Sequence, residues 1–456
     1  MSIKSHFQKM KKTILFLISF ISLSSYALSQ KYDIKTYSLQ ECLTTAIQNN
    51  YDIVVYKAAL ESASSNKTSA FGSYLPMLQF SGGYSRTLNQ QGGRTVNVGG
   101  QIIPLGSPSP NSYNMGLNAG LNLFDGLFRE ANFRAANYNY NAADLNLQQS
   151  VVNVKIDVFR KFFDFATKKQ ILQMRKENFE QGKKELESIQ AQNQAGVIPI
   201  SVVYSKEADL GTLELELARA ENDVNLSRAN LLSTMGLDPT LNVDFSLADI
   251  KTEISQSDIS EFRNRIGKFD KMLQEALDLR YDYQSSESSM KSASQRVVMS
   301  RSAYFPSVQL GGGWSWSNSE FNQFDTYGRA YFGVNLSIPI FDGFNTNSNI
   351  EQSQYSLKQA EVQRLKLNQM IKTQVEQALL NLDATEKQIL ISQKALTASD
   401  LNYKVLTSRF EVGSANITEL IQANTQYLNA QINQITSVFG YLLAQKELEY
   451  AIGRLN

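Results

Sequence analysis

Few residues of this chain could carry out the acid–base, nucleophilic or metal chemistry of an enzyme. The 456 residues include one histidine, His6, and one cysteine, Cys42. Histidine-based catalytic triads, His/Cys zinc sites, iron–sulfur clusters, haem ligation and intrachain disulfides need more of these residues than the chain has. Carboxylate, lysine or tyrosine chemistry is not excluded, but no cleft-forming domain is apparent for a carboxylate-based hydrolase. We therefore expect no catalytic residue, no cofactor and no metal site.

Nucleotide and nucleic-acid binding are also disfavoured. Lys and Arg number 44 against 43 Asp and Glu, whereas a general nucleic-acid binder is normally basic. Glycine pairs occur at 82–83, 92–93 and 99–100, but none leads into the Gly-Lys-Ser/Thr and helix of a phosphate-binding loop. Cys42 adjoins apolar Leu43 in an expected helix, which predicts a small packed residue rather than a reactive thiol.

Residues 1–29 have the pattern of a secretory signal peptide. Four lysines precede an apolar run over 14–21, and small residues follow, ending in Ala27-Leu28-Ser29. The run is shorter than the roughly 20 residues that cross a bilayer. Cleavage after Ser29 would remove His6 and the four lysines, which changes the net charge from +1 to −3. We expect the signal peptide to direct the mature protein out of the cytoplasm, and no later apolar run of about 18 residues would hold it in the inner membrane.

The two halves of the chain resemble each other, which predicts a duplicated unit. Matches occur first at an offset of 230 positions and then at 217, and the change of offset lies between the hairpins. The matching pairs are 74–76 with 304–306, 124–126 with 341–343, Gly196 with Gly413, and Gly236 with Gly453. We expect repeat 1 over 30–236 and repeat 2 over 273–456, joined by a linker over 237–272. Each repeat should hold a helix, a β-hairpin, a very long helix and a return helix.

Apolar residues at every second position predict one β-hairpin in each repeat, over 77–124 and 307–341. They alternate with Ser, Asn, Gln and Gly, so one face meets an apolar medium and the other a polar one. Strands of about ten residues match tilted transmembrane strands. A soluble sheet would alternate in the same way, but the signal peptide favours the membrane. Residues 89–112, with three prolines, are expected to form a long exposed loop.

Four such strands cannot close a barrel, because the smallest common closed barrels have eight. An open sheet edge is not tolerated in lipid, so we expect the chain to oligomerise. Tyr84, Trp314 and Trp316 are candidates for an aromatic girdle at the membrane interface.

Two stretches without proline, 127–195 and 345–412, predict very long helices. Apolar residues recur every seven positions in the first, at Val151, Val158, Phe165, Leu172, Phe179 and Leu186, and five of these have apolar or aromatic partners 217 positions later. A sustained heptad is typical of a coiled coil, and helices of this length span on the order of 100 Å. Each stretch ends near a helix-terminating glycine, Gly196 or Gly413, and a return helix follows over 199–235 or 416–452.

In their order and spacing, these features resemble the TolC-like outer membrane efflux proteins. The resemblance covers nearly all of the mature chain, including the Tyr-Leu/Phe-Pro entry to each hairpin, the Phe-Asp-Gly exit and the tip sequence Phe410-Glu411-Val412-Gly413. It implies an α+β membrane protein with a tandem internal repeat. A homotrimer would form a twelve-stranded transmembrane β-barrel, four strands from each chain, continued by a long periplasmic α-helical coiled-coil barrel. Residues 237–272 and the C-terminus would belong to a mixed equatorial region.

The resemblance also implies a non-enzymatic exit duct in the outer membrane of a Gram-negative bacterium. Such ducts serve tripartite efflux systems, in which small molecules such as drugs, toxic compounds or metal ions arrive from an inner-membrane transporter of the RND, ABC or MFS type. A periplasmic adaptor engages the helix tips, outer membrane lipid surrounds the barrel, and nucleic acid is not a partner. The same architecture would suit the conduit of a type I protein secretion system. A periplasmic coiled-coil structural protein would explain the heptads but not the hairpins.

Family ducts often close their periplasmic end with an inward coil of the return helices and a ring of acidic side chains. Aligned from Gly413, Glu419 falls on one acidic position and Gln422 on the next. Glu419 either lines the entrance and favours cations, or is a solvated residue near a helix N-terminus, where acids are favoured. Three other tip positions lack the polar, tyrosine and arginine residues of the family and favour closure by packing: Val202, Phe410 and Ala415.

Overall fold

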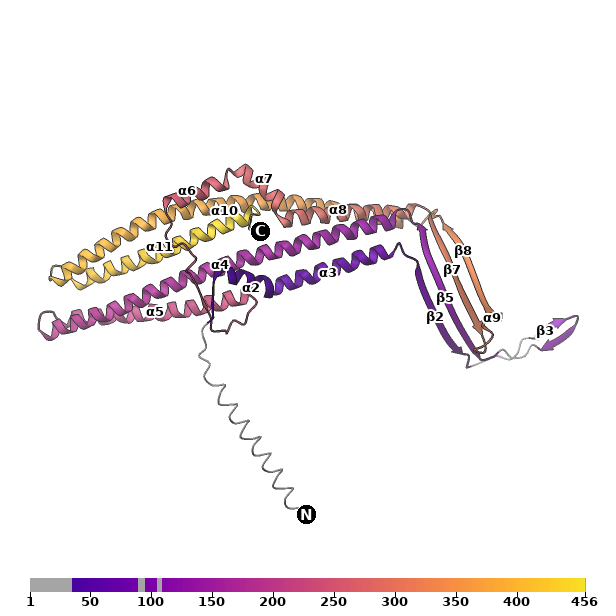
Figure 1. Cartoon of the computed structure of the whole chain (residues 1–456), viewed down its shortest axis with the longest axis horizontal. Coiled ribbons are helices and arrows are strands. Elements are labelled where there is room, and N and C mark those ends of the chain that lie inside the picture. The colour runs from indigo at the N-terminus through magenta and orange to yellow at the C-terminus, as the bar shows by residue number, and fades with distance from the viewer. Residues whose placement is uncertain (1–34, 89–94, 105–108, 456) are drawn as a thin grey trace, which may run out of the picture.

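A computed structural model describes residues 35–88, 95–104 and 109–455, so the predicted signal peptide and part of the predicted loop lie outside the described residues. The described chain is a long bundle of helices with a sheet at one end (Figure 1). The first half contains α2 (Leu39–Asn49), α3 (Tyr51–Gly72), β2 (Met77–Arg86), β5 (Asn111–Phe124), α4 (Phe128–Gln194) and α5 (Ile200–Thr234). The second contains α7 (Phe269–Leu279), α8 (Tyr281–Arg301), β7 (Ser307–Asn318), β8 (Gly328–Ser337), α10 (Asn345–Glu411) and α11 (Ile417–Ala451).

The two longest helices, α4 and α10, have 67 residues each, which corresponds to about 100 Å at 1.5 Å per residue. The period-seven residues of α4 are buried or half-buried, and so are their partners Val375, Leu382, Ile389, Leu396 and Tyr403 in α10. In each half, the long helix packs along its return helix, α4 on α5 and α10 on α11. The heptad therefore marks the face that each long helix buries.

The largest hydrophobic cluster lies midway along the helices, where the two repeats meet. Phe162 and Phe165 of α4 pack their rings against Phe245, with centroids 6.3 and 5.0 Å apart. Phe439 of α11 joins the same cluster from the second repeat. Cys42 is also fully buried there, which confirms a small packed residue, and burial raises the pKa of its thiol to about 12.

The linker between the repeats contributes to this middle region. Its strand β6 (Asp244–Phe245) pairs in parallel with β1 (Thr36–Tyr37). Its helix α6 (Gln256–Ile266) begins at a capping box formed by Ser255 and Asp258. Arg263 of α6 donates to both carboxylate oxygens of Glu386 in α10, so the linker is held against the second long helix.

The sheet is antiparallel throughout and has the strand order β2-β5-β7-β8. The two hairpins join through β5 and β7, which leaves β2 and β8 as the sheet edges. Residues in register share a face, so each cross-strand row is either apolar or polar. One apolar row is Leu78, Ala119, Gly312 and Phe332, and the adjacent polar row is Gln79, Asn118, Gly313 and Tyr331.

Two details of the hairpins differ from the sequence-based expectation. The predicted loop 89–112 contains a small hairpin of β3 (Thr95–Val98) and β4 (Gln101–Pro104). Gly99 and Gly100 both have positive φ, as a two-residue type I′ turn requires, and Val98 and Gln101 flank them as a cross-strand pair. The second hairpin was expected to reach 341, but β8 ends at Ser337. Pro339 has no N–H to continue a ladder, which accounts for the early end.

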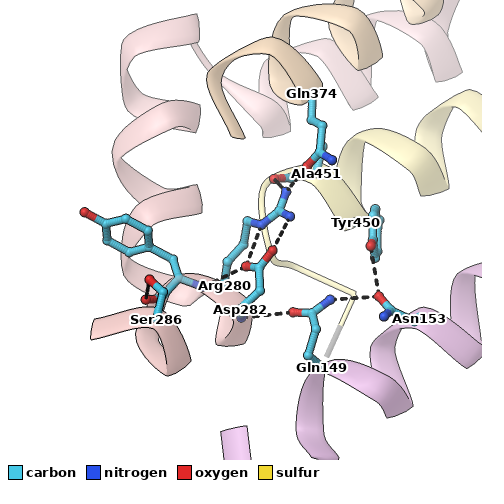
Figure 2. A network of polar contacts seen from close by, with 9 residues as sticks. Gln149, Asn153, Arg280, Asp282, Ser286, Gln374, Tyr450 and Ala451 are labelled. Carbon is cyan, nitrogen blue, oxygen red and sulfur yellow. Dashed lines mark hydrogen bonds and ion pairs between the residues drawn. The ribbon is translucent and has the colours of Figure 1, made fainter. Parts of the chain in front are cut away.

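In each repeat, a polar side chain at the bend between two helices binds the end of the return helix. In repeat 1, Asn50 lies between α2 and α3 and donates to the Thr234 carbonyl oxygen at 2.9 Å. In repeat 2, Arg280 lies between α7 and α8 and donates to the Ala451 carbonyl oxygen at 3.2 Å (Figure 2). Arg280 also pairs with Asp282 at 2.6 Å and donates to Gln374 of α10. The two contacts thus lie at equivalent positions in the two halves of the chain but are made by different chemistry.

Each hairpin returns to its long helix through a sharp turn with two consecutive left-handed residues. Gly126 and Leu127 have φ of 68° and 73°, and their equivalents Gly343 and Phe344 both have φ of 67°. A left-handed non-glycine residue costs roughly 1–2 kcal/mol. Asp125 offsets part of this cost in repeat 1, because it pairs with Arg129 in the first turn of α4 at 2.8 Å.

We expect Gly126→Ala to destabilise the protein more than Gly343→Ala. An added Cβ at Gly126 would lie 2.6 Å from the Ser302 carbonyl oxygen, whereas at Gly343 its nearest neighbour would be Asn345 at 3.9 Å. The second change should cost roughly 1 kcal/mol for the left-handed backbone alone, and the first roughly 3 kcal/mol or more. Loss of helical circular dichroism on heating measures both, and equal midpoints would show that the close approach at Gly126 is not limiting.

Candidate functional site

The end of the molecule opposite the sheet consists of two helical hairpins (Figure 1). Between α4 and α5, Gly196 has φ of 75°, and the Val197 N–H donates to the Gln192 carbonyl oxygen. Between α10 and α11, Gly413 has φ of 71°, and the Ser414 N–H closes the same bond to Arg409. Both predicted tip glycines therefore lie in left-handed turns that end a long helix, the conformation that glycine adopts most readily.

Glu419 lies in the first turn of α11 and is exposed. Its backbone N–H donates to Asn416 Oδ1 at 2.9 Å, and its carboxylate accepts from the Asn416 N–H at 3.4 Å. This is a capping box, which satisfies two N–H groups at the start of the helix. Gln422 lies one turn further along and is also exposed. Both side chains are available at the same end of the return helix.

An apolar cluster joins the two hairpins at their tips. Ile189 of α4 and Val203 of α5 are buried against Ile417 and Leu420 of α11. Val202 and Phe410 pack against this cluster as partly buried side chains. Their partial burial indicates that apolar packing holds the tips of the two helical hairpins together.

Next to the apolar cluster lies a buried charged group that the sequence analysis missed. Lys206 of α5 is 2% exposed, and its ammonium donates to Glu185 of α4 at 2.8 Å and to Asp209 at 2.9 Å. Tyr403 of α10 donates its hydroxyl to the other oxygen of Glu185 at 3.2 Å. The three charges and the tyrosine therefore link the first hairpin to the second.

The pKa values of this network follow from its burial and its charges. Burial lowers the pKa of Lys206, but the hydrogen bonds and negative charges of Glu185 and Asp209 outweigh it, so the pKa is raised. Burial, and then the Glu185 carboxylate, raise the pKa of Tyr403, whose ring stacks on Tyr427 at 5.6 Å. At neutral pH, lysine and tyrosine are both protonated and donate to the same carboxylate.

The heptad of α5 contained a signal for this network. Leu213, Ala220 and Ser227 follow Lys206 at intervals of seven, and all four are buried. A lysine at a core position of a coiled coil is costly unless it is paired, so its place in the period predicts buried acidic partners. The sequence alone did not identify those partners, because they lie 21 residues away and one turn away.

The three candidate girdle residues lie on the apolar face of the sheet but differ in how exposed their side chains are. Tyr84 is exposed and donates its hydroxyl to Asn111 at 3.0 Å, and Trp314 is half-buried. Trp316 is 1% exposed, because Phe321 and Phe324 of the β7–β8 connection pack their rings against it. The side chains that face outward at this position are therefore the two phenylalanines.

Other kinds of site find little support in the part of the chain that the structure describes. No group of three or more His, Cys, Asp or Glu side chains there could hold a metal ion. Among the described helices, none combines the length and apolar character needed to cross a bilayer.

Comparisons with known proteins agree on one kind of protein. The family described as "Outer membrane efflux protein" matches residues 42–237 and 272–454, one segment in each half. Outer membrane protein TolC of Vibrio cholerae is 21% identical over 432 residues, covering 92% of this chain and 91% of that protein. The solved structure of CusC superposes with a TM-score of 0.76 at 17% identity, covering 94% and 96% of the two chains. The Campylobacter jejuni CmeC outer membrane channel gives 0.75 at 18% identity, covering 93% and 90%.

Replacing the buried lysine should loosen the tips. Lys206→Met leaves Glu185 and Asp209 without their cation, and we expect a loss of about 3 kcal/mol in stability at the tip. Lys183→Met is the matched control, because Lys183 forms an exposed pair with Glu180 that contributes at most about 1 kcal/mol. Hydrogen exchange of amides near Gly196 and Gly413 measures the difference. Equal protection in the two variants would contradict the role of Lys206.

Proposed function

This chain belongs to the outer membrane efflux protein family, and from that premise we propose that three copies form one exit duct. Members of the family are outer membrane channels rather than enzymes, and the chain lies in the outer membrane of a Gram-negative bacterium with its helices extending into the periplasm. In the proposed duct, small molecules pass from an inner-membrane transporter of the RND, ABC or MFS type to the exterior. A periplasmic adaptor engages the helix tips.

The observation that carries the trimer is the four-stranded sheet. Its edge strands, β2 and β8, are each paired on one side only among the described residues, and one face of the sheet is apolar and exposed. Phe80 is 66% exposed on that face and Phe332 76%. Lipid would cover the apolar side chains, but it cannot pair the edge N–H and C=O groups. Pairing β8 of one copy with β2 of the next would close twelve strands around a lumen lined by the polar face.

The helices carry apolar side chains that also lack cover in one chain. Exposed apolar residues lie along α3 and α10, and they include Tyr51, Val54, Val55, Tyr355, Val362 and Leu365. Soluble monomers rarely expose many large apolar side chains close together. In the proposed trimer, neighbouring copies would cover these surfaces and form a closed helical barrel below the membrane.

Two neighbouring residues of β8 test which face meets lipid. Val334 lies on the apolar face and Asn335 on the polar face. We expect Val334→Arg to abolish the heat-modifiable trimer of the outer membrane fraction, because arginine facing lipid near the membrane centre costs about 2–4 kcal/mol per copy. Asn335→Arg should still give the trimer. If the unmodified protein were found as a soluble monomer in the periplasm, the proposed duct would be wrong.

Glu419 is the residue that we propose for the entrance. Three copies of Glu419 and Gln422 would project from the starts of the α11 helices, and the carboxylates would favour cations. The capping box does not compete with this role, since one carboxylate can accept the Asn416 N–H and still carry its charge. Closure itself would rest on the apolar cluster at the tips, supported by the Lys206 network.

Glu419→Gln separates the charge from the helix cap. Glutamine at the third helical position also completes a capping box, so the variant should fold and assemble normally. We expect its single-channel current to lose cation preference, whereas Glu411→Gln, an exposed change at the end of α10, should leave it unchanged. An unaltered cation preference in Glu419→Gln would mean that the residue only caps the helix.

A further inference from the structure

The polar face of the sheet is almost free of charge. In the four strands it carries Ser, Asn, Gln, Gly, one methionine and one tyrosine, with Arg329 as its one charged side chain among the described residues. Arg329 follows the first residue of β8, directly after the connection that joins β7 to β8. That connection lies at the end of the sheet away from the helices (Figure 1). Arg329 is therefore near the outer end of the strands.

Arg329 is neither covered nor neutralised by its neighbours. It is exposed, and its cross-strand row consists of Ser315, Gly116 and Ser81, which are too small to shield a guanidinium. It makes no ion pair with a carboxylate of the described chain. Glu320 and Asp325 are the acidic residues nearest in sequence, and both belong to the connection rather than to the polar face. Glu320 already accepts from Asn322 at 2.8 Å.

In the described strands, the part of the polar face on the helix side of Arg329 carries no charged side chain and includes a hydrogen bond between strands. Tyr331 lies on the same face two residues further along and donates its hydroxyl to Asn118 at 2.9 Å. Its register partner is Gly313, where a Cβ would lie 2.5 Å from the Leu117 carbonyl oxygen. Glycine thus allows the strands to approach closely while the tyrosine spans them. Among the described residues, no acidic side chain lies on this part of the polar face.

We propose that Arg329 is a specificity-determining residue of the duct, where three guanidinium groups form a ring at the outer exit and bind anionic solutes. This inference rests on the proposed trimer, because only a closed barrel turns the polar face into a lumen. A guanidinium donates in a planar fork that matches carboxylate and phosphate oxygens, so solutes with several such groups are the preferred class. The exit therefore favours anions, whereas an entrance lined by Glu419 would favour cations.

Side-specific block of single channels tests this ring. Inorganic tripolyphosphate is added to the outer compartment at low ionic strength, because screening shortens the reach of exposed charges to about 10 Å at 0.1 M salt. We expect block of the unmodified channel and roughly tenfold weaker block, or none, in Arg329→Gln. Arg329→Lys should restore much of it, since lysine keeps the charge. Arg86→Gln is the control, because Arg86 lies at the same end of the sheet on the opposite face.

The outcomes separate the two proposals. Equal block of the unmodified channel and Arg329→Gln, or block of equal strength from both compartments, would overturn the exit ring while leaving the trimeric duct intact. Heat-modifiable trimers in every variant show that assembly is unaffected. A preparation that forms neither trimers nor channels would overturn the duct and, with it, this inference.

Discussion

A strand edge in hydrocarbon leaves backbone N–H and C=O groups without partners, and each such group costs several kcal/mol. In this chain the constraint falls on β2 and β8, the two edges of the sheet. It explains why a protein whose strands face lipid cannot act as one copy. The second strand of each hairpin is followed by a left-handed joint, at Gly126 or Gly343, that leads into a long helix. The proposed assembly of three copies follows from this requirement.

Most of the fold was predictable because its signals are periodic. A period of seven marked the buried face of α4 and α10, and a period of two marked the two faces of the sheet. The small hairpin β3–β4 was missed because prolines in the same segment outweighed the Gly99-Gly100 turn. The early end of β8 was missed because alternation continues past Pro339, although the hydrogen bonding cannot.

The candidate site was less predictable, because it depends on contacts between segments. The tip glycines and the position of Glu419 followed from sequence. The capping box with Asn416 was not anticipated, and neither was the network of Lys206, Glu185 and Tyr403, which joins α4, α5 and α10. Trp316 shows the same limit. The sequence correctly predicted that Trp316 lies on the apolar face of its strand. Only the structure places Phe321 and Phe324 over it.

The two hairpin tips of one chain differ in surface chemistry, and this sets a stoichiometry. The first tip exposes Val197, Pro199 and Ile200, whereas the second exposes Val412 together with the polar Ser414, Asn416 and Glu419. Around the proposed trimer, tips with and without an exposed glutamate in the first turn of the return helix would alternate along the rim. A binding protein that recognises one kind of tip would attach three times, and one that tolerates both would attach six times. Counting the bound copies would therefore reveal whether such a protein distinguishes the two halves of the chain.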